Sequence, residues 1–443
     1  MTEKKNNVSR RHFLGAVGAV GAASAIGAQG PALFAGQQAV KLPRLLDRAP
    51  DGDTLRAGLV GCGGRGTGAA LNFLDAGPNL EIVALGDVFE DRLNGCRDRL
   101  KKDKKVDVPK KNCFIGFDAF RQVIDSDVDV VILATPPHFR PEHFSACIRG
   151  RKHVFMEKPV AVDPVGARSI MASARKAKAI NLSVVTGTQR RHQRDYVATY
   201  KKIAAGAIGD IVSANCYWNQ SQLWYRTPQE GWSDMEAMIR DWVNWTWLSG
   251  DHIVEQHVHN IDVIHWFTGK IPVKAVGFGG RHRRVTGDQY DFFSIDYVYD
   301  NKMHMHSMSR QINGCVTNVS ESIMGTKGTS NCRNTIWTPD GKQAWKYGYA
   351  PDESGKPRKN VKVSPYVQEH IDLVTAIRTD DPINEAENTA ISTLVAIMGR
   401  ISAYTGKEVT YEEMMNSNYR IGPTEYAMGD VDLEAVAPVP GKA

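Results

Sequence analysis

Residues 55–87, LRAGLVGCGGRGTGAALNFLDAGPNLEIVALGD, decide the fold of the N-terminal part of the chain. They open with an apolar run, pass through a glycine-rich turn and a helix-forming stretch, and end with a second apolar run that closes on Asp87. This order predicts a strand, a tight turn, a helix and a second, parallel strand. Gly61, Gly63 and Gly66 form G-x-G-x-x-G directly after the first run, and Asp87 follows about twenty residues later.

Glycines at this spacing are typical of a site for the pyrophosphate of a dinucleotide. Gly61 permits the tight turn, Gly63 lets the backbone approach the phosphates, and Gly66 allows helix and strand to pack closely. The phosphate oxygens then meet free N–H groups at the helix N-terminus, where Gly64 and Arg65 lie. The alternative reading of the motif is a glycine-rich turn that binds no ligand.

Asp87 predicts which dinucleotide is bound. A carboxylate at the end of the second strand accepts the hydroxyls of the adenosine ribose and repels a 2′-phosphate. We therefore expect NAD, with NADP disfavoured, although the nearby Arg92 weakens that preference.

The rest of the N-terminal half continues the alternation of strands and helices. The pattern predicts strands over 128–134, 153–156 and 182–186 and helices over 141–149 and 164–179, which is typical of a doubly wound parallel sheet in a domain of residues 53–190. Ligands of such sheets lie beyond the carboxyl ends of the strands, where Thr135 and Lys158 are expected.

A second domain is expected over residues 191–443, because 443 residues exceed one ordinary core. Alternating runs at 211–218, 273–280, 291–300 and 303–310 predict a mostly antiparallel, open sheet. Helices over 195–204, 366–379 and 386–404 are expected to flank it, the last ending at Gly406 as its C-cap.

The first 35 residues resemble a twin-arginine export signal. Arg10 and Arg11 are followed by Phe13, Leu14 and a weakly apolar run that is too short to span a bilayer comfortably. We expect this leader to engage the twin-arginine export machinery and the protein to be periplasmic or otherwise exported, with residues 36–52 as a linker. The alternative is a basic N-terminal arm before a helix.

Composition excludes several other classes. The chain is 42% apolar and 23% charged, as soluble proteins are, and about half of its net charge of +6 lies in the leader, so nucleic acid is not an expected partner. Seven cysteines without a C-x-x-C pair do not predict a disulfide scaffold. His304 and His306 share one face of a predicted strand, but an isolated H-x-H is more often structural, so no metal is expected.

Several motifs together resemble the glucose-fructose oxidoreductase, inositol dehydrogenase and MocA family. They are GLVGCGGRG, ATPPHFRPEHF, GRKHVFMEKP, GTQRRH and EQHVHNIDVIHW, in family order over about residues 53–270. The resemblance implies a Rossmann domain whose cofactor also meets Pro136, His138 and Glu157, and a Lys158 that contacts both the nicotinamide ribose and the reacting hydroxyl. It further implies pairing of copies through the open face of the C-terminal sheet, hence a homo-oligomer.

The last motif predicts a proton relay. If residues 253–268 form one helix, Glu255, His259 and Asp262 lie on one face. A carboxylate beside a histidine orients the ring and raises its pKa, which suits a general base. Many family members have Asp where this chain has Glu255, so the longer side chain shifts the relay. The alternative is an ordinary polar face on a packed helix.

Substrate-binding residues are expected around this helix. Seven of the nine tryptophans lie between positions 218 and 266, and aromatic rings pack against the apolar faces of sugar rings. Core packing is the alternative explanation of these rings. The residues predicted to contact substrate are Trp245, Asp262, Arg190, Arg191 and His192. For the last three, contact with the cofactor and a structural ion-pair network are the alternatives.

These expectations together predict an NAD-dependent oxidoreductase of a sugar hydroxyl, with Lys158, His259 and Glu255 as catalytic residues. Because free NAD is scarce outside the cytoplasm, an exported enzyme would have to retain its cofactor. Two alternatives are open. One is a glycoside hydrolase that oxidises C3 transiently and eliminates the aglycone, as in the NAD-dependent N-acetylgalactosaminidase-type hydrolases that the chain also resembles. The other is a cofactor-retaining sugar-binding protein without turnover.

Overall fold

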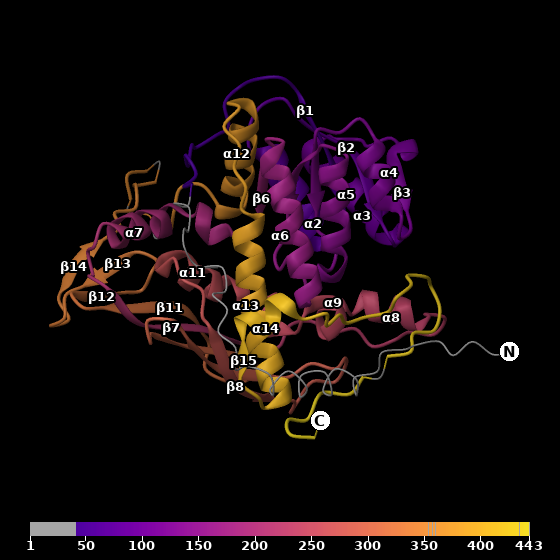
Figure 1. Ribbon diagram of the computed structural model, residues 1–443. Coiled ribbons are helices and arrows are strands. Elements are labelled where there is room, and N and C mark those ends of the chain that lie inside the picture. The colour runs from indigo at the N-terminus through magenta and orange to yellow at the C-terminus, as the bar shows by residue number, and fades with distance from the viewer. Residues whose placement is uncertain (1–40, 353, 357, 359, 434, 443) are drawn as a thin grey trace.

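The computed structural model describes residues 41–442, apart from 353, 357, 359 and 434, so the predicted leader lies outside the described residues. Two β-sheets stand on either side of the long helix α13 (Ala386–Thr405), which runs through the middle of the molecule (Figure 1). None of the described helices is both long and apolar enough to cross a membrane.

The first sheet is parallel throughout and has the strand order β3-β2-β1-β4-β5-β6. Its strands are β1 (Leu55–Val60), β2 (Leu80–Asp87), β3 (Cys113–Ile115), β4 (Val130–Leu133), β5 (His153–Met156) and β6 (Val184–Thr186). From β1 the chain first adds β2 and β3 on one side and then returns to add β4, β5 and β6 on the other side. The predicted doubly wound sheet is therefore confirmed.

Helices cover both faces of this sheet. One face packs against α4 (Ala119–Asp125), α5 (Arg140–Arg149) and α6 (Pro164–Ala179). The other packs against α2 (Gly64–Asp75), α3 (Glu90–Lys104) and α12 (Pro365–Arg378). Helix α12 belongs by sequence to the second half of the chain, yet Ile371 and Val374 enter the same core as Leu59 and Phe73.

The second sheet is mostly antiparallel, as predicted, with the order β14-β13-β12-β11-β7-β10-β9-β8-β15. Only β7 and β10 pair in parallel among its described strands. Its strands are β7 (Ile211–Gln220), β8 (Lys274–Gly280), β9 (Phe292–Val298), β10 (His304–Gln311), β11 (Asn318–Gly325), β12 (Gly328–Ser330), β13 (Thr335–Trp337), β14 (Gln343–Lys346) and β15 (Val409–Thr410).

The remaining described elements lie between or beside the strands. They are η1 (Lys110–Asn112), η2 (Pro137–Phe139), η3 (Gln189–His192), α7 (Arg194–Ala204), α8 (Asp234–Arg240), η4 (Trp242–Asn244), α9 (Thr246–Ser249), α10 (His252–Glu255), α11 (Val258–Thr268) and α14 (Tyr411–Asn416). Gly406 caps α13 with φ of 72°, as the sequence predicted.

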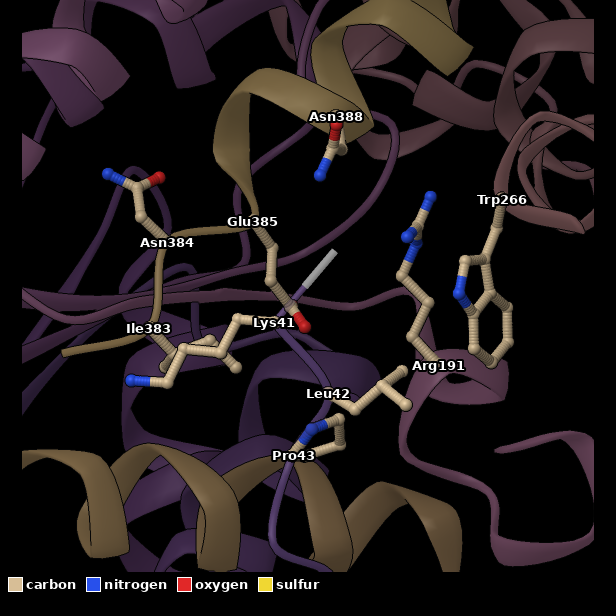
Figure 2. A pocket seen from close by; sticks show the side chains of 9 residues that line it. All are labelled: Lys41, Leu42, Pro43, Arg191, Trp266, Ile383, Asn384, Glu385 and Asn388. Carbon is tan, nitrogen blue, oxygen red and sulfur yellow. The ribbon is translucent and has the colours of Figure 1, made fainter. Parts of the chain in front are cut away.

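The described part of the predicted linker, residues 41–52, lies against both halves of the chain. Asp47 forms ion pairs with Arg194 of α7 and Lys362, and the backbone N–H of Ala49 donates to the carbonyl of Ala76 at 2.8 Å. Figure 2 shows Lys41, Leu42 and Pro43 lying across Ile383, Asn384 and Glu385. These contacts hold residues 41–52 against the start of α13.

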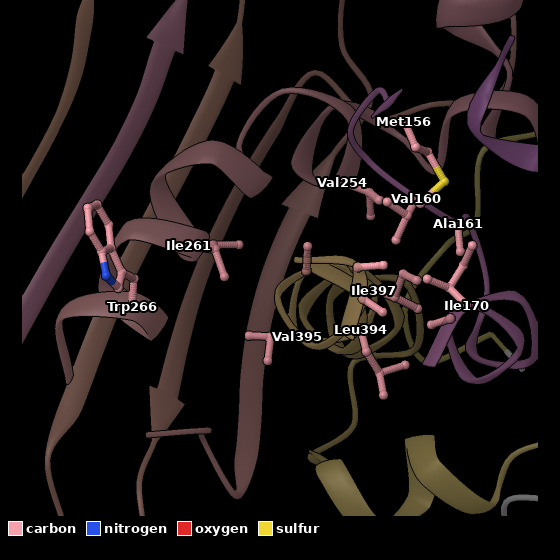
Figure 3. Packing of buried hydrophobic residues seen from close by; sticks show 14 of the residues in the cluster. Met156, Val160, Ala161, Ile170, Val254, Ile261, Trp266, Leu394, Val395 and Ile397 are labelled. Carbon is pink, nitrogen blue, oxygen red and sulfur yellow. The ribbon is translucent and has the colours of Figure 1, made fainter. Parts of the chain in front are cut away.

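Helix α13 joins the two sheets through its buried side chains. In Figure 3, Leu394 and Ile397 point toward Ile170 and Val160 of the first domain, while Val395 points toward the strands of the second sheet. Burial of aliphatic side chains contributes about 2 kcal/mol each, so this two-sided helix holds the two domains in one packed core.

Candidate active site

The glycine-rich turn borders a cavity of about 440 Å³ at the carboxyl ends of β1, β2 and β4. Gly61 has φ of 95°, and a Cβ on Gly66 would stand 1.8 Å from the carbonyl oxygen of Gly61, so both positions require glycine. A Cβ on Gly63 or Gly64 would meet no protein atom within 4 Å, because both residues face the cavity. This backbone cradle at the start of α2 fits a dinucleotide pyrophosphate.

Asp87 lies where the sequence predicted, at the end of β2 and on the cavity wall. Its carboxylate accepts hydrogen bonds from the backbone N–H of Cys62 at 2.6 Å and of Phe89 at 2.9 Å. Burial raises the pKa of this carboxyl above its usual value, although the two N–H groups oppose that shift. Asp87 therefore also fixes the phosphate-binding turn from below.

The other predicted cofactor residues divide into two sets. Thr135, Pro136 and Arg65 line the cavity, and the Arg65 guanidinium pairs with buried Glu157 at 2.5 Å. His138 shares a 2.7 Å hydrogen bond with the hydroxyl of Tyr426 and contacts the ring of Trp247, and it is not among the residues that line the cavity. Its ring therefore packs among residues from the later half of the chain.

The predicted continuous helix over 253–268 is wrong, because the chain breaks between α10 and α11 at Gln256 and His257. In an unbroken helix the carbonyl of Glu255 would accept from the N–H of His259. Here that N–H points to the carbonyl of Gln256 at 3.4 Å, and the Glu255 carbonyl accepts from the ammonium of Lys158 instead. The break thus provides a ligand for a lysine that lies 97 residues earlier.

Lys158 and Glu255 form a buried ion pair. The ammonium donates to a Glu255 carboxylate oxygen at 3.0 Å, and both side chains are under 10% exposed. The other carboxylate oxygen accepts from the side-chain amide of Gln256. Glu255 therefore positions Lys158, whereas the sequence predicted that it would orient His259.

His259 has the opposite electrostatic environment from the one expected. Burial, together with the positive charges of Lys158 and Arg190, holds the pKa of His259 well below its usual range. The prediction that the pKa of His259 is raised was wrong, because the Glu255 carboxylate pairs with Lys158 instead. The ring stacks on Trp218 of β7, with centroids 5.5 Å apart and planes at 21°. A buried, neutral imidazole at this place can accept a proton.

Arg190 completes the cationic side of the site. Its guanidinium lies 5.6 Å from the centre of the Trp218 ring and 3.4 Å from a carboxylate oxygen of Glu321. Glu321 in turn accepts hydrogen bonds from Tyr196 at 2.9 Å and Asn260 at 2.6 Å, so this carboxylate is shared among three side chains. Arg190, Trp218 and His259 form one stacked set at the seam of the two domains.

The other predicted substrate residues have partners within the protein. Arg191 makes a bidentate ion pair with Asp262 at 2.8 and 2.9 Å, and His192 bridges Asp372 and Glu385 at 2.8 and 3.0 Å. Arg191 also lines the cavity drawn in Figure 2, whose volume of about 40 Å³ is far below that of a sugar site. This geometry favours a structural role for the three residues, and their contact with substrate stays a prediction.

Tryptophans of the predicted sugar pocket lie in different surroundings. Trp245 packs beside the apolar cluster of Met235, Met238 and Trp247, and its contact with substrate also stays a prediction. Trp218, which sequence reasoning did not single out, stacks on His259. The signals for it in the sequence were its membership of the tryptophan cluster and its place in the predicted strand 211–218. Among the described residues, no three His, Cys, Asp or Glu side chains converge on a possible metal position.

Comparison with known proteins identifies two matching family models. Residues 55–186 match the GFO_IDH_MocA model, described as an oxidoreductase family with an NAD-binding Rossmann fold, and residues 196–331 match the GFO/IDH/MocA C-terminal domain. The inositol 2-dehydrogenase of Salmonella paratyphi B is 26% identical over 216 residues, covering 48% of this chain and 54% of that protein. The chain thus spans about half the length of the curated relatives it matches.

Two further similarities bear on the site. The 2,7-anhydro-N-acetylneuraminate hydratase of Escherichia coli is 26% identical over 153 residues, covering 34% of this chain and 37% of that protein. The structure of scyllo-inositol dehydrogenase from Lactobacillus casei, with bound NAD(H) and scyllo-inositol, covers 81% of this chain and 99% of its own, with a TM-score of 0.59 and 21% identity. At this identity the structural match establishes the fold.

Proposed function

Because the chain belongs to the GFO/IDH/MocA family of NAD-binding oxidoreductases, we propose that it oxidises a hydroxyl of a sugar or sugar derivative with a tightly retained NAD. The observation that carries this proposal is the meeting of Lys158 with the carbonyl freed at the helix break, one turn before His259. Two contacts support the proposal. The charge of Lys158 acts on the pKa of His259, and Glu157, the neighbour of Lys158, pairs with Arg65 on the cavity wall.

The chemistry divides into two transfers. Oxidation of a secondary alcohol removes a hydride from carbon and a proton from oxygen and leaves a ketone. Bound NAD supplies the hydride acceptor. His259 accepts the hydroxyl proton at a ring nitrogen, since its depressed pKa keeps it neutral at pH 7. Lys158, held by Glu255, donates a hydrogen bond to the same oxygen and stabilises the charge that develops there.

Retention of the cofactor follows from the proposed export. The leader directs a folded protein out of the cytoplasm, so NAD is loaded before export and reoxidised in place by a second substrate. Residues 1–35 support this proposal only through their sequence, Arg10-Arg11-His12-Phe13-Leu14 before a weakly apolar run. Fractionation of cells that finds the mature protein in the cytoplasm would contradict it.

A second candidate is glycoside hydrolysis through transient oxidation at C3. The similarity to a hydratase of a sugar derivative favours it, because water addition to an oxidised or unsaturated sugar is one of its steps. In this reaction His259 and Lys158 would have the same roles, and C3 would be reduced again at the end. A third candidate is sugar binding without turnover. The buried Lys158–Glu255 ion pair argues against it, because desolvating two charges costs free energy of folding and binding alone does not need that pair.

The decisive experiment separates cofactor binding from chemistry. The purified protein is denatured and the supernatant is assayed for NAD(H) and NADP(H), and cofactor-free protein is titrated with both dinucleotides. We expect NAD to be released and to bind more tightly than NADP. The loaded protein is then mixed with inositols, with paired aldose and ketose sugars, and with p-nitrophenyl glycosides. Absorbance at the NADH band identifies oxidation, and release of nitrophenol identifies hydrolysis.

Three outcomes would distinguish the candidates. Protein that neither releases nor binds a nicotinamide dinucleotide would refute the central proposal. Nitrophenol release that depends on NAD would favour the hydrolase. Cofactor binding without any change of absorbance across the sugar panel would leave binding without turnover as the function.

We further propose that two copies pair through the open face of the second sheet. Ala275 and Ile295 face α13, whereas Val276 and Phe278 alternate with them on the opposite face and are 48% and 66% exposed. Exposed aromatic and aliphatic side chains on one face are typical of an interface between subunits.

Replacing Phe278 by Asp is expected to shift the protein from oligomer to monomer, because a carboxylate cannot be buried unpaired in an apolar interface. Light scattering coupled to size-exclusion chromatography measures the mass. Val285→Asp, at another exposed apolar position outside the sheet, serves as the control. A wild-type protein that is monomeric at all concentrations would contradict the proposal.

A further inference from the structure

The dinucleotide cavity has a wall that does not come from the Rossmann domain. Its side chains belong to residues 221–249, here called the cap, which follow β7 in the second domain. The cap residues that line the cavity are Trp224, Arg226, Ile239, Arg240 and Trp242. In Figure 1 the cap helices α8 and α9 lie below the Rossmann domain, next to the yellow C-terminal segment. The cleft is thus closed between two domains.

Arg240 ties the cap to the turn that follows β2. Its guanidinium makes a bidentate ion pair with Asp91, with distances of 3.0 and 3.1 Å, and a third contact with Glu236 at 2.7 Å. The same group lies 3.9 Å from the centre of the Phe89 ring. Phe89 and Asp91 follow directly after Asp87, so this contact fixes the cap over the predicted ribose position. The Arg240 side chain is only 13% exposed.

A cluster of apolar side chains also holds the cap against the Rossmann domain. Met235, Met238 and Ile239 of α8 pack against Phe89, with Phe117 at the edge of the same cluster. Residues 421–433 close over this cluster through Ile421, Tyr426, Val431 and Leu433. The backbone N–H of Met235 donates to the carbonyl of Gly429 at 3.1 Å, and the Tyr426 ring stacks on Phe117 at 6.0 Å.

The position of the cap identifies which half of the dinucleotide it meets. Asp87, Phe89 and Phe117 follow β2 and β3, whereas Lys158 follows β5 on the other side of β1 in the sheet. In a doubly wound sheet the acid after the second strand receives the adenosine ribose. The indole rings of Trp224 and Trp242 and the guanidinium of Arg226 match a flat, electron-rich heterocycle attached to a diphosphate.

We propose that the cap binds the adenosine half of the cofactor and that the dinucleotide leaves only when the cap separates from the turn after β2. This inference rests on the proposed function, since it takes NAD to be the ligand. It assigns adenosine-binding residues to the second domain, and it gives the retention of NAD a structural cause that does not depend on export. The ion pair of Arg240 with Asp91 is the latch.

The test measures cofactor dissociation directly. Cofactor-free protein is loaded with NADH, and its fluorescence is followed in a stopped-flow instrument after mixing with excess NAD. Arg240→Met keeps the apolar stem of the side chain and removes the latch, and Asp91→Asn weakens the same contact from the Rossmann side. Both variants are expected to release NADH about tenfold faster or more, with little change in association. Arg99→Met, which removes the exposed pair with Asp103 on α3, is the control.

A second measurement separates adenosine contacts from opening. Trp242→Ala is expected to weaken binding of ADP-ribose, and binding of nicotinamide mononucleotide is expected to stay unchanged. Two results would overturn the proposal that the cap binds adenosine and controls cofactor release. One is release of NADH at the wild-type rate from both latch variants, and the other is unchanged binding of ADP-ribose by Trp242→Ala. Failure of the wild-type protein to bind NADH at all would instead refute the proposed function.

Discussion

Replacing Lys158 by Met or His259 by Ala is expected to reduce turnover by about 100-fold or more, the scale on which a positioned proton donor or acceptor acts. Both residues are under 10% exposed. The two losses are expected to be less than additive when combined, because both residues act on the same proton. Steady-state rates of NAD-dependent oxidation with the preferred sugar provide the measurement.

The pH profile distinguishes a relay from a structural role. The charge of Lys158 helps to hold the pKa of His259 down, so His259 stays neutral well below pH 6.5 in the wild type. In Lys158→Met the acid limb of the residual kcat/KM is expected to move to higher pH, because that positive charge is gone. A variant that only disturbs folding would lower the rate without moving this limb.

Lys152→Met is the matched control for Lys158. Lys152 precedes β5 at its other end, and its ammonium donates to the carbonyl of Val128 at 2.7 Å. It is also a partly buried lysine bound to a carbonyl, but it lies at the amino end of β5, whereas Lys158 follows the carboxyl end. We expect near wild-type turnover. Equal losses in the two lysine variants, or an unchanged rate in Lys158→Met, would refute the assignment of Lys158.

The cofactor-free protein is expected to lose stability steeply as the pH falls below about 6.5. Burial lowers the pKa of His138, His143 and His257 to about 3 and that of His265 to about 4. Between those values and 6.5, the unfolded chain binds a proton on each histidine and the folded chain does not. Stability therefore falls with pH, by about 1 kcal/mol per pH unit for each histidine.

Other buried groups titrate in the same window. Burial also lowers the pKa of His153, His259 and His370, so these three histidines add to the fall in stability. His192, whose pKa is raised by Glu385 and Asp372 against its burial, is protonated in both states below 6.5 and contributes its slope only at higher pH. Burial raises the pKa of four carboxyl groups, which act in the opposite direction: Glu369, Asp87, Asp163 and Asp241. The buried histidines with lowered pKa values outnumber them, so stability still falls with pH.

Urea unfolding at pH 7 and pH 5 measures the effect. His143 stacks on Phe120 at 4.1 Å, so His143→Phe keeps an aromatic ring in the core and removes one titrating group. The variant is expected to lose less stability between the two pH values than the wild type does. The exposed His304, paired with Asp296, provides the control variant His304→Gln. Equal stability of the wild type at pH 7 and pH 5 would show that these histidines are charged when folded.

Local features of the chain were predictable because they depend on neighbouring residues. The turn at Gly61 needs a positive φ, and the short distance between Gly66 and Gly61 leaves no room for a side chain, so the motif itself specifies the phosphate cradle. Alternating and continuous apolar runs likewise specified both sheets, because side-chain periodicity follows backbone geometry. The end of α13 at Gly406 has the same local origin.

The geometry of the proposed active site was decided by contacts between distant segments. Periodicity indicated one helix through Glu255 and His259, but the ammonium of Lys158 captures the Glu255 carbonyl and the helix breaks there. The sequence also indicated a histidine with a raised pKa, whereas burial and the same lysine lower it. Neither effect has a signal within a few residues of His259.

The sequence by itself thus determined the two sheets, the dinucleotide turn and the residue types of the relay, because propensity, periodicity and steric limits act over a few neighbouring residues. Only the tertiary structure decided that α12 packs into the core of the first sheet, that Trp218 stacks on His259, and that Arg240 forms part of the cavity wall. These arrangements join segments many residues apart, and their free energy comes from burial and charge pairing that exist only once the chain has folded.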